Sequence, residues 1–358
     1  YTAGEFTTSD QEIISVDWDG TNFVAINGNS NASYISTDGT SWTSGTLPAN
    51  DTWKKVTYDG TSWLAVAGNT TTGTTSAATS SDGTTWTSST LPSAGNWIDV
   101  DGNGQGTWIA VEKNDPGTNV AALTTDNGSS WATLTVTPAT GPLTGVAYGN
   151  GIWVIIEDGT NNCYTSTDTV TWTQRTMPAT GEWHQIVYHN DRFVAMTYNT
   201  DSSDNNVAIS FNGTTWYGDT VEGGEFSEIG YSMGTYMMFK KNTDVLKYSR
   251  DGLSWSEKLL DTAANWSAVA GNDSSTWVGF QYAGTQHKKI DFGTRALARA
   301  VPQSGRIGSF LIHEVGAGYD SNPTVTVHDT QNTLDVTTLA RVANGVLPQP
   351  HMTNQGTG

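Results

Sequence analysis

The chain has 358 residues, of which 35 are acidic and 16 are Lys or Arg, so its formal net charge is −19. A chain with so few basic residues is not expected to bind nucleic acid through a basic surface. No apolar run approaches the roughly 18 residues of a membrane helix, so no membrane insertion is expected. The single Cys163 excludes a disulfide framework and a multi-cysteine metal site. We expect no cofactor and no bound metal.

An internal repeat dominates residues 1–293. Six copies of a short stretch that ends in tryptophan, five of them with a glycine, recur about every 39 to 45 residues. This interval is the length of one four-stranded propeller blade. The six tryptophans are Trp42, Trp86, Trp131, Trp172, Trp216 and Trp255, and the acids that precede five of them are Asp38, Asp82, Asp126, Asp168 and Asp251.

A second hairpin precedes each of these copies. Residues 56–66 show its pattern, in which alternating β-branched and aromatic residues flank the dipeptide Asp59-Gly60. An Asp-Gly or Asn-Gly turn between such runs is a strong hairpin signal. The same pattern predicts strand, tight turn and strand at 16–26, 100–111, 146–156, 187–196, 229–239 and 269–280. No segment shows helical periodicity, so helix should be nearly absent.

Counting these hairpins predicts an all-β protein with a seven-bladed β-propeller over residues 1–293. The seventh unit lacks the hairpin that ends in tryptophan and is therefore one strand short. The segment Gly4–Thr8 precedes the first unit, and we expect it to supply that strand. Closing the ring in this way leaves only short, protected strand edges.

The repeat resembles the Asp-box motif of sialidase-type and related BNR-repeat propellers, best at Thr124–Trp131. In such turns a short acid accepts backbone N–H bonds, glycine supplies a positive φ and the tryptophan covers the turn. We expect these indoles to carry much of the burial between blades. Sialidases bind the substrate carboxylate with an arginine triad. The propeller offers only Arg175, Arg192 and Arg250, which fall in or beside turns, so this activity is not expected.

The connection between the second and third strands of each unit varies widely in sequence. The two hairpin turns repeat, and all of them lie on the opposite face of the disc. Loops without a folding duty can diverge and acquire a ligand. The candidate binding residues on this variable-loop face are Asn69, Thr72, Lys113, Asp115, Tyr198, Asp201 and Asp204. The alternative is that long polar loops are merely tolerated there.

Two further patterns favour a structural role over metal binding. Residues 99–104 match the first half of a calcium loop, but Ala110 stands where the final acidic ligand is required. The aligned residues of other units are hairpin turns, and we expect a turn here too. His184 and His189 share one strand but point to opposite faces, and no third ligand is evident.

The pattern changes after Gly293. Residues 294–306 are expected to form a linker, and residues 307–358 a small β module. The run from Gly316 to Tyr319, followed by Pro323–Val327, resembles modules of tail and fibre virion proteins of T4-like cyanophages. Residues 353–358 resemble the start of a further copy, so we expect that the chain continues. The resemblance implies contacts with other virion proteins through this module.

These features predict a non-enzymatic structural or adhesion protein of a bacteriophage tail, fibre or baseplate, located in the virion or outside the cell. The propeller would serve as a docking platform or bind a host-surface glycan. One alternative is a polysaccharide-degrading propeller enzyme that uses carboxylates near the axis, with Glu182, Glu225 and Glu228 as candidates. Another alternative is a secreted bacterial adhesin.

Overall fold

The computed structural model describes residues 2–5, 12–113, 120–198, 204–273, 276–282, 286–291, 297–303, 306–314, 324–327 and 336–339. These residues form strands and turns without helix, and therefore include no helix that could cross a bilayer. The chain divides into two compact units. The first comprises Tyr1–Asn272 and Trp277–Ile290, and the second comprises Asp273–Thr276 and Asp291–Gly358.

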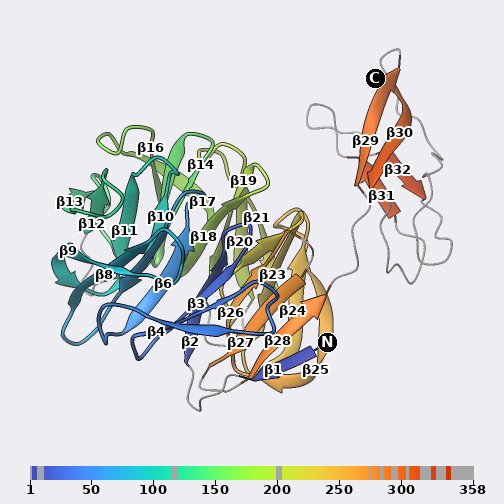
Figure 1. Cartoon of the computed structure of the whole chain (residues 1–358). Helices are drawn as coiled ribbons and strands as arrows, with labels where there is room; N and C mark the ends of the chain where they lie inside the picture. Colours follow the sequence, from blue (N-terminus) through green and yellow to red (C-terminus); the bar gives the residue numbers. More distant parts are fainter. Residues whose placement is uncertain are drawn as a thin grey trace. The chain divides into compact units, whose positions relative to one another are not determined.

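Seven four-stranded antiparallel sheets make up the first unit, which is a seven-bladed β-propeller (Figure 1). The inner strands are β2 (Ile13–Trp18), β6 (Trp53–Tyr58), β10 (Trp97–Gly102), β14 (Leu143–Gly149), β18 (Trp183–His189), β22 (Gly230–Ser232) and β26 (Trp266–Gly271). The second strands are β3 (Phe23–Asn27), β7 (Trp63–Ala67), β11 (Trp108–Glu112), β15 (Ile152–Glu157), β19 (Arg192–Thr197), β23 (Thr235–Phe239) and β27 (Thr276–Gln281).

The remaining strands complete each blade outward. The third strands are β4 (Ala32–Ser36), β8 (Thr74–Ser80), β12 (Val120–Thr124), β16 (Thr160–Ser166), β20 (Asn205–Ser210), β24 (Thr243–Ser249) and β28 (Gln286–Asp291). The outer strands of the first six blades are β5 (Thr43–Thr46), β9 (Thr87–Gly95), β13 (Ala132–Thr135), β17 (Thr173–Gly181), β21 (Tyr217–Val221) and β25 (Ser256–Ala264).

The N-terminal segment supplies the outer strand of the seventh blade. Strand β1 (Thr2–Glu5) pairs antiparallel with β28, with Thr2 opposite Lys289 and Glu5 opposite Gln286. The predicted closure by an N-terminal strand is therefore confirmed. The strand spans residues 2–5 rather than the expected 4–8, and residues 6–8 lie outside the described residues. A hydrophobic cluster that joins Ile13 and Phe23 to Val278 and Phe280 seals the same junction.

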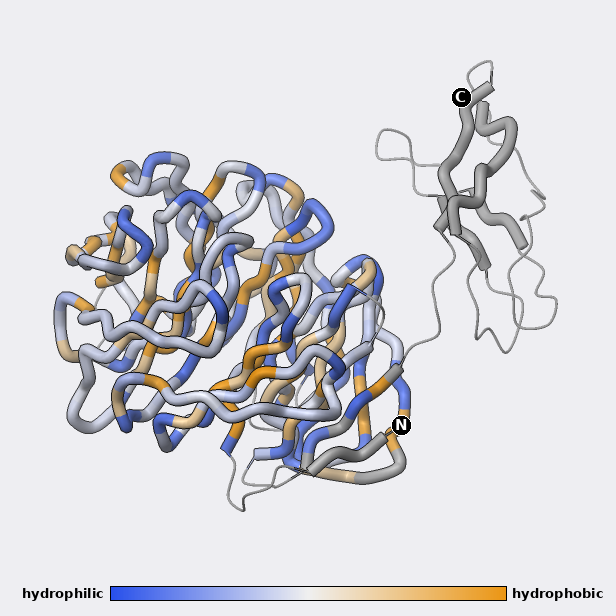
Figure 2. Tube along the Cα trace, viewed as in Figure 1, coloured by the Kyte–Doolittle hydropathy of each residue, from blue (hydrophilic) through white to orange (hydrophobic). Residues whose placement is uncertain are grey.

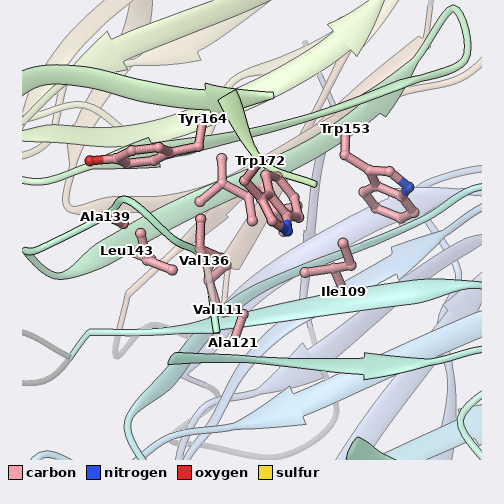
Figure 3. Packing of buried hydrophobic residues seen from close by; sticks show 11 residues of the cluster. Ile109, Val111, Ala121, Val136, Ala139, Leu143, Trp153, Tyr164 and Trp172 are labelled. Atoms are coloured by element: carbon pink, nitrogen blue, oxygen red, sulfur yellow. The ribbon is translucent and has the colours of Figure 1, made fainter. Parts of the chain in front are cut away.

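Hydrophobic clusters between neighbouring blades form the core. Figure 2 shows hydrophobic segments along the strands of the propeller and hydrophilic segments at many of its loops. One cluster joins the third and fourth blades, where Ile109 and Val111 of β11 pack with Trp153 and Leu143 (Figure 3). The largest side chains that are fully buried include Trp53, Trp63, Trp97, Trp108, Trp183, Trp266 and Trp277, and all seven come from inner or second strands.

The expectation that the repeat tryptophans carry much of the inter-blade burial is wrong in its emphasis. Trp42, Trp86, Trp131, Trp216 and Trp255 are only partly buried, and Trp172 alone of the six is classed as buried. The reason is their position after the tip of a turn. Trp86 and Trp131, for example, pack on the rim of clusters that indoles of inner and second strands already fill.

The turns that precede these tryptophans are held by their acids, as expected. The Asp38 Oδ1 atom accepts the backbone N–H groups of Thr40 and Ser41, at 2.8 Å in each case. Asp82, Asp126, Asp168 and Asp251 accept equivalent bonds in their own turns. Gly83 has a φ of 71°, and a Cβ there would lie 2.5 Å from Val24 Cγ2. Glycine therefore satisfies both the backbone conformation and the packing.

The second unit contains two antiparallel strand pairs. Strand β29 (Leu297–Gln303) pairs with β30 (Arg306–Glu314), and β31 (Thr324–Val327) pairs with β32 (Val336–Leu339). Strand β29 thus occupies part of the segment that was predicted to be a linker. Its sequence, Leu-Ala-Arg-Ala-Val, is compatible with a strand because it is apolar and contains neither Gly nor Pro up to Val301.

Two tryptophans of one cluster test where the burial energy lies. Trp108 is fully buried in it, whereas Trp131 packs against its edge. We expect Trp108→Ala to lower the free energy of unfolding by about 3–5 kcal/mol because it leaves a large cavity. Trp131→Ala should cost only about 1–2 kcal/mol. Urea unfolding of both variants measures the difference, and equal losses would contradict this assignment.

Candidate functional site

A bulge in the inner strands shapes the site. In six blades the pairing register shifts after the first residue of the inner strand, so that one residue is unpaired. A bulge of this kind re-aims a side chain. All six bulge residues line one cavity, and they are Ile14, Lys54, Ile98, Thr144, His184 and Ser267. We call these the bulge positions.

This cavity lies among the inner strands, at the end where the variable connections begin, and we call it the variable-mouth cavity. Its volume is about 290 Å³. Besides the bulge positions, it is lined by Thr70, Tyr198 and Lys241, which come from or border variable connections. A second cavity of about 250 Å³ includes the opposite strand ends, with Asp17, Asp101 and His189 in its wall. Lys55 and Asp99 line both cavities.

Lys55 is the cation at the centre of the inner ring. Its Nζ lies 3.1 Å from Glu228 Oε1, and the hydroxyl of Ser15 donates to the other oxygen of Glu228 at 3.3 Å. Burial opposes the charged form of Lys55. The carboxylates of Glu228, Asp99 and Asp17 outweigh this effect, so the pKa of Lys55 is raised above its usual value. Lys55 therefore stays protonated and compensates neighbouring negative charge.

The acids of the inner ring also bind backbone groups of the next blade. The Asp17 carboxylate accepts the N–H of Tyr58 at 2.9 Å, and that of Asp101 accepts the N–H of Tyr148 at 2.8 Å. Two residues before Asp101 in the strand, Asp99 accepts the N–H of Val146 at 2.9 Å. Gln185 and Ser15 act in the same way toward Ile229 and Val56. These side chains link inner strands that share no ladder of backbone hydrogen bonds.

We expected residues 99–104 to form a turn like the aligned residues of other blades. Asp99 and Asp101 lie on a strand instead. Both lie on β10, because the strand continues to Gly102 and the tight turn begins only after it. Desolvation raises the pKa of each carboxyl to about 7. For Asp99 the charge of Lys55 opposes this rise, whereas Asp99 and Asp17 add to the rise at Asp101.

At the variable mouth, Tyr198 is the one predicted binding residue that lines the cavity. Its hydroxyl donates to Glu225 Oε2 at 2.8 Å, and Lys241 Nζ lies 5.1 Å from the centre of its ring. Lys241 is also 3.7 Å from the same Glu225 oxygen. The ring of His184 lies 5.0 Å from that of Tyr198. Desolvation, followed by the charges of Lys113 and Lys241, lowers the pKa of His184 to about 4.

The other predicted binding residues are placed differently. Asn69 accepts the N–H groups of Thr71 and Thr72 and so stabilises its own turn, although the adjacent Thr70 lines the cavity. Lys113 Nζ pairs with Asp158 at 2.7 Å. Asp204 accepts the N–H of Gly223 at 3.1 Å. Asp115 and Asp201 lie outside the described residues.

The two histidines of β18 lie at different ends of the ring and line different cavities. His184 lines the variable-mouth cavity, and His189 lines the opposite one, where it stacks on Tyr231 at 4.8 Å. Within the described part of the chain, no three His, Cys, Asp or Glu residues are grouped so that they could hold a metal ion.

Lys54, Lys55 and Gln185 were not among the residues predicted from the sequence. Their signal lies in the inner strands rather than in the loops. Aligning these strands on their first residue places Ser15, Lys55, Asp99 and Gln185 in one column. The same column carries Gly or Ala in other blades. A position that is charged or polar in some blades and small in others indicates that its side chains do more than fill the core.

Comparison with known proteins shows the fold. No protein-family model and no curated protein sequence matches the chain. Among solved structures, virginiamycin B lyase from Staphylococcus aureus in its inactive H270A form with quinupristin has a TM-score of 0.67 at 12% identity, covering 81% of this chain and 98% of that chain. YCF48 bound to D1 peptide has a TM-score of 0.59 at 15% identity, covering 81% and 96%. The WD40 β-propeller domain of Doa1 has a TM-score of 0.58 at 12% identity, with the same coverage.

The raised pKa of Asp101 predicts how stability depends on pH. Between about pH 4 and 7 the native state binds more protons than the unfolded state, so Asp101 makes stability fall as pH rises through this range. Asp101→Asn removes this ionisation and keeps an acceptor for Tyr148. We expect this variant to gain on the order of 2 kcal/mol relative to the wild type between pH 5 and pH 8.

Urea unfolding at pH 5, 6.5 and 8 measures this effect. The control is Asp219→Asn, which removes one negative charge from an exposed position on β21. If the wild type and the Asp101→Asn variant show parallel pH curves, the carboxyl of Asp101 does not titrate as described.

Proposed function

We propose that this protein is a non-enzymatic binding platform of a bacteriophage tail, fibre or baseplate, and that its propeller binds a host-surface glycan in the variable-mouth cavity. The observation that carries this proposal is the cavity itself. Six of the seven blades contribute the same bulge position to it, but the residue type changes from apolar to cationic to hydroxyl. A rigid ring with variable side chains at equivalent positions suits specific recognition.

The chemistry of the wall favours a saccharide. Phe226 and Tyr198 offer aromatic surface for the C–H face of a sugar ring. Thr70 offers a hydroxyl group for its hydroxyls. A volume of about 290 Å³ is at the low end of the roughly 300–1,000 Å³ of ligand sites, so one sugar residue and its linkage would fill it.

The virion assignment rests on sequence resemblance. The turn acids resemble those of Asp-box propellers, and residues 316–327 resemble modules of phage tail and fibre proteins. Solved propellers of similar fold include a lyase, a peptide-bound protein and a WD40 domain, so the fold leaves function to the site. Antibody labelling of purified phage particles and of bacterial surfaces separates a virion protein from the alternative, a secreted bacterial adhesin.

A glycan array with the whole chain tests the binding function. We expect saturable binding to a subset of bacterial surface polysaccharides. Tyr198→Ala should weaken this binding at least about tenfold, because it removes the aromatic wall and the hydroxyl that orders Glu225. Tyr217→Ala, at an exposed position on β21, is the matched control and should bind normally. Absence of binding to every saccharide would contradict the proposal.

One observation favours the enzyme alternative. Asp99 and Glu228 both line the variable-mouth cavity, and their environments differ. Desolvation raises the pKa of Asp99 to about 7, whereas Glu228 pairs with Lys55. Two carboxyls of this kind could serve as acid and base. The saccharides that bind are therefore also assayed for new reducing ends. Release that Asp99→Asn and Glu228→Gln both abolish would establish the enzyme, and binding without release is what the platform predicts.

A further inference from the structure

Lys54 differs from the other lysines around the variable mouth. Lys55, Lys113 and Lys241 have carboxylate partners at 3.1, 2.7 and 3.7 Å. Lys54 lies at a bulge position in the cavity wall and is half-buried. Among the described residues, no hydrogen bond or ion pair satisfies its ammonium.

An ammonium in this position is costly. Partial loss of water disfavours a charge that nothing compensates. Desolvation accordingly lowers the pKa of Lys54 below its usual value. A bound anion would compensate the charge and would gain a charge-assisted hydrogen bond in a partly dry site.

Among the described residues that line this cavity, Lys54 is the lysine without a carboxylate partner. Lys55 and Lys241 line the same cavity, but each pairs with a carboxylate. His184, on the inner strand of the fifth blade, lines the cavity as well. An anionic group in the cavity is therefore attracted to Lys54.

The rest of the wall limits the kind of anion. Asp99 and Glu228 also line the cavity, and they would repel a phosphate dianion more strongly than a single carboxylate. Ile14, Ile98 and Phe226 provide apolar surface, which a bare inorganic anion would not use. A sugar ring has an apolar face and several hydroxyls. A sugar ring that also carries one carboxylate complements all of these groups.

We propose that the variable-mouth cavity binds an acidic sugar residue, with the sugar carboxylate on Lys54. This inference rests on the proposed glycan-binding function and specifies its ligand class. Lys54 contributes the ion pair, and Phe226, His184 and Lys241 line the rest of the same cavity. Neutral saccharides lack the group that compensates Lys54 and bind more weakly.

Calorimetric titration of the whole chain tests this assignment. The probes are oligosaccharides that contain glucuronate, galacturonate, mannuronate or N-acetylneuraminate, each paired with its methyl ester as the neutral control. We expect at least one acid to bind about tenfold or more tightly than its ester. The preference should shrink as salt is raised from 0.05 to about 0.5 M, because screening weakens charge pairs near a surface.

Variants at Lys54 assign the preference to this side chain. Lys54→Gln should remove the difference between acid and ester, and Lys54→Arg should keep most of it. Lys258→Gln removes one positive charge from the exposed outer strand β25 and is the matched control. Thermal unfolding of each variant verifies that the propeller is folded.

The outcomes separate this inference from the proposed function. Equal binding of acid and ester, or an unchanged preference in Lys54→Gln, overturns the acidic-sugar assignment and leaves glycan binding intact. Binding of a peptide with a terminal carboxylate, without binding of any saccharide, overturns both. Absence of saccharide binding in the titrations and on the glycan array also overturns both.

Discussion

The inner strand of each blade is an edge strand, and this constraint organises the centre of the molecule. One side of each inner strand pairs with the second strand, and the other side faces the axis without a backbone partner. Exposed N–H groups on that side need acceptors. Asp17, Asp99 and Asp101 supply them to the following blade, and Ser15 and Gln185 do the same. The ring is thereby linked at its narrowest point by side chains.

This solution concentrates carboxylates in a partly dry channel. Desolvation raises the pKa values of Asp99 and Asp101 to about 7, so these acids are held near the point of ionisation at neutral pH. Lys55 offsets the accumulated charge and pairs with Glu228 across the ring. Asp17 and Asp101 line one cavity, whereas the bulge positions line the other. The same strands therefore serve stability at one end and leave side chains free for recognition at the other.

The sequence was sufficient for the fold because its signals are local and repeated. Turn dipeptides, alternation along strands and the interval between tryptophans together predict the blade number and the need for a closing strand. Burial was harder to predict, because Trp108 and Trp131 are chemically identical and only the packing of the blades makes one internal and the other peripheral.

The site was predicted only in part. Tyr198 was recognised because its connection varies among blades, and it does line the cavity. Lys54 and His184 were not predicted to line one cavity, since 130 positions separate them and only the ring and its bulges bring both to it. Strand alternation alone would send Lys54 and Lys55 to opposite sides, and the bulge after Trp53 changes this.

Titration of the Asp99 and Asp101 carboxyls by NMR, with selectively labelled aspartate, is the most direct measurement of this charge balance. Lys55→Met should raise the pKa of Asp99 further above 7 and leave Asp101 nearly unchanged, because Lys55 acts on Asp99. Glu228→Gln should shift Asp99 in the opposite direction, since it removes a negative charge. If Asp99 titrates identically in the wild type and in both variants, Lys55 and Glu228 do not govern the charge of the inner ring.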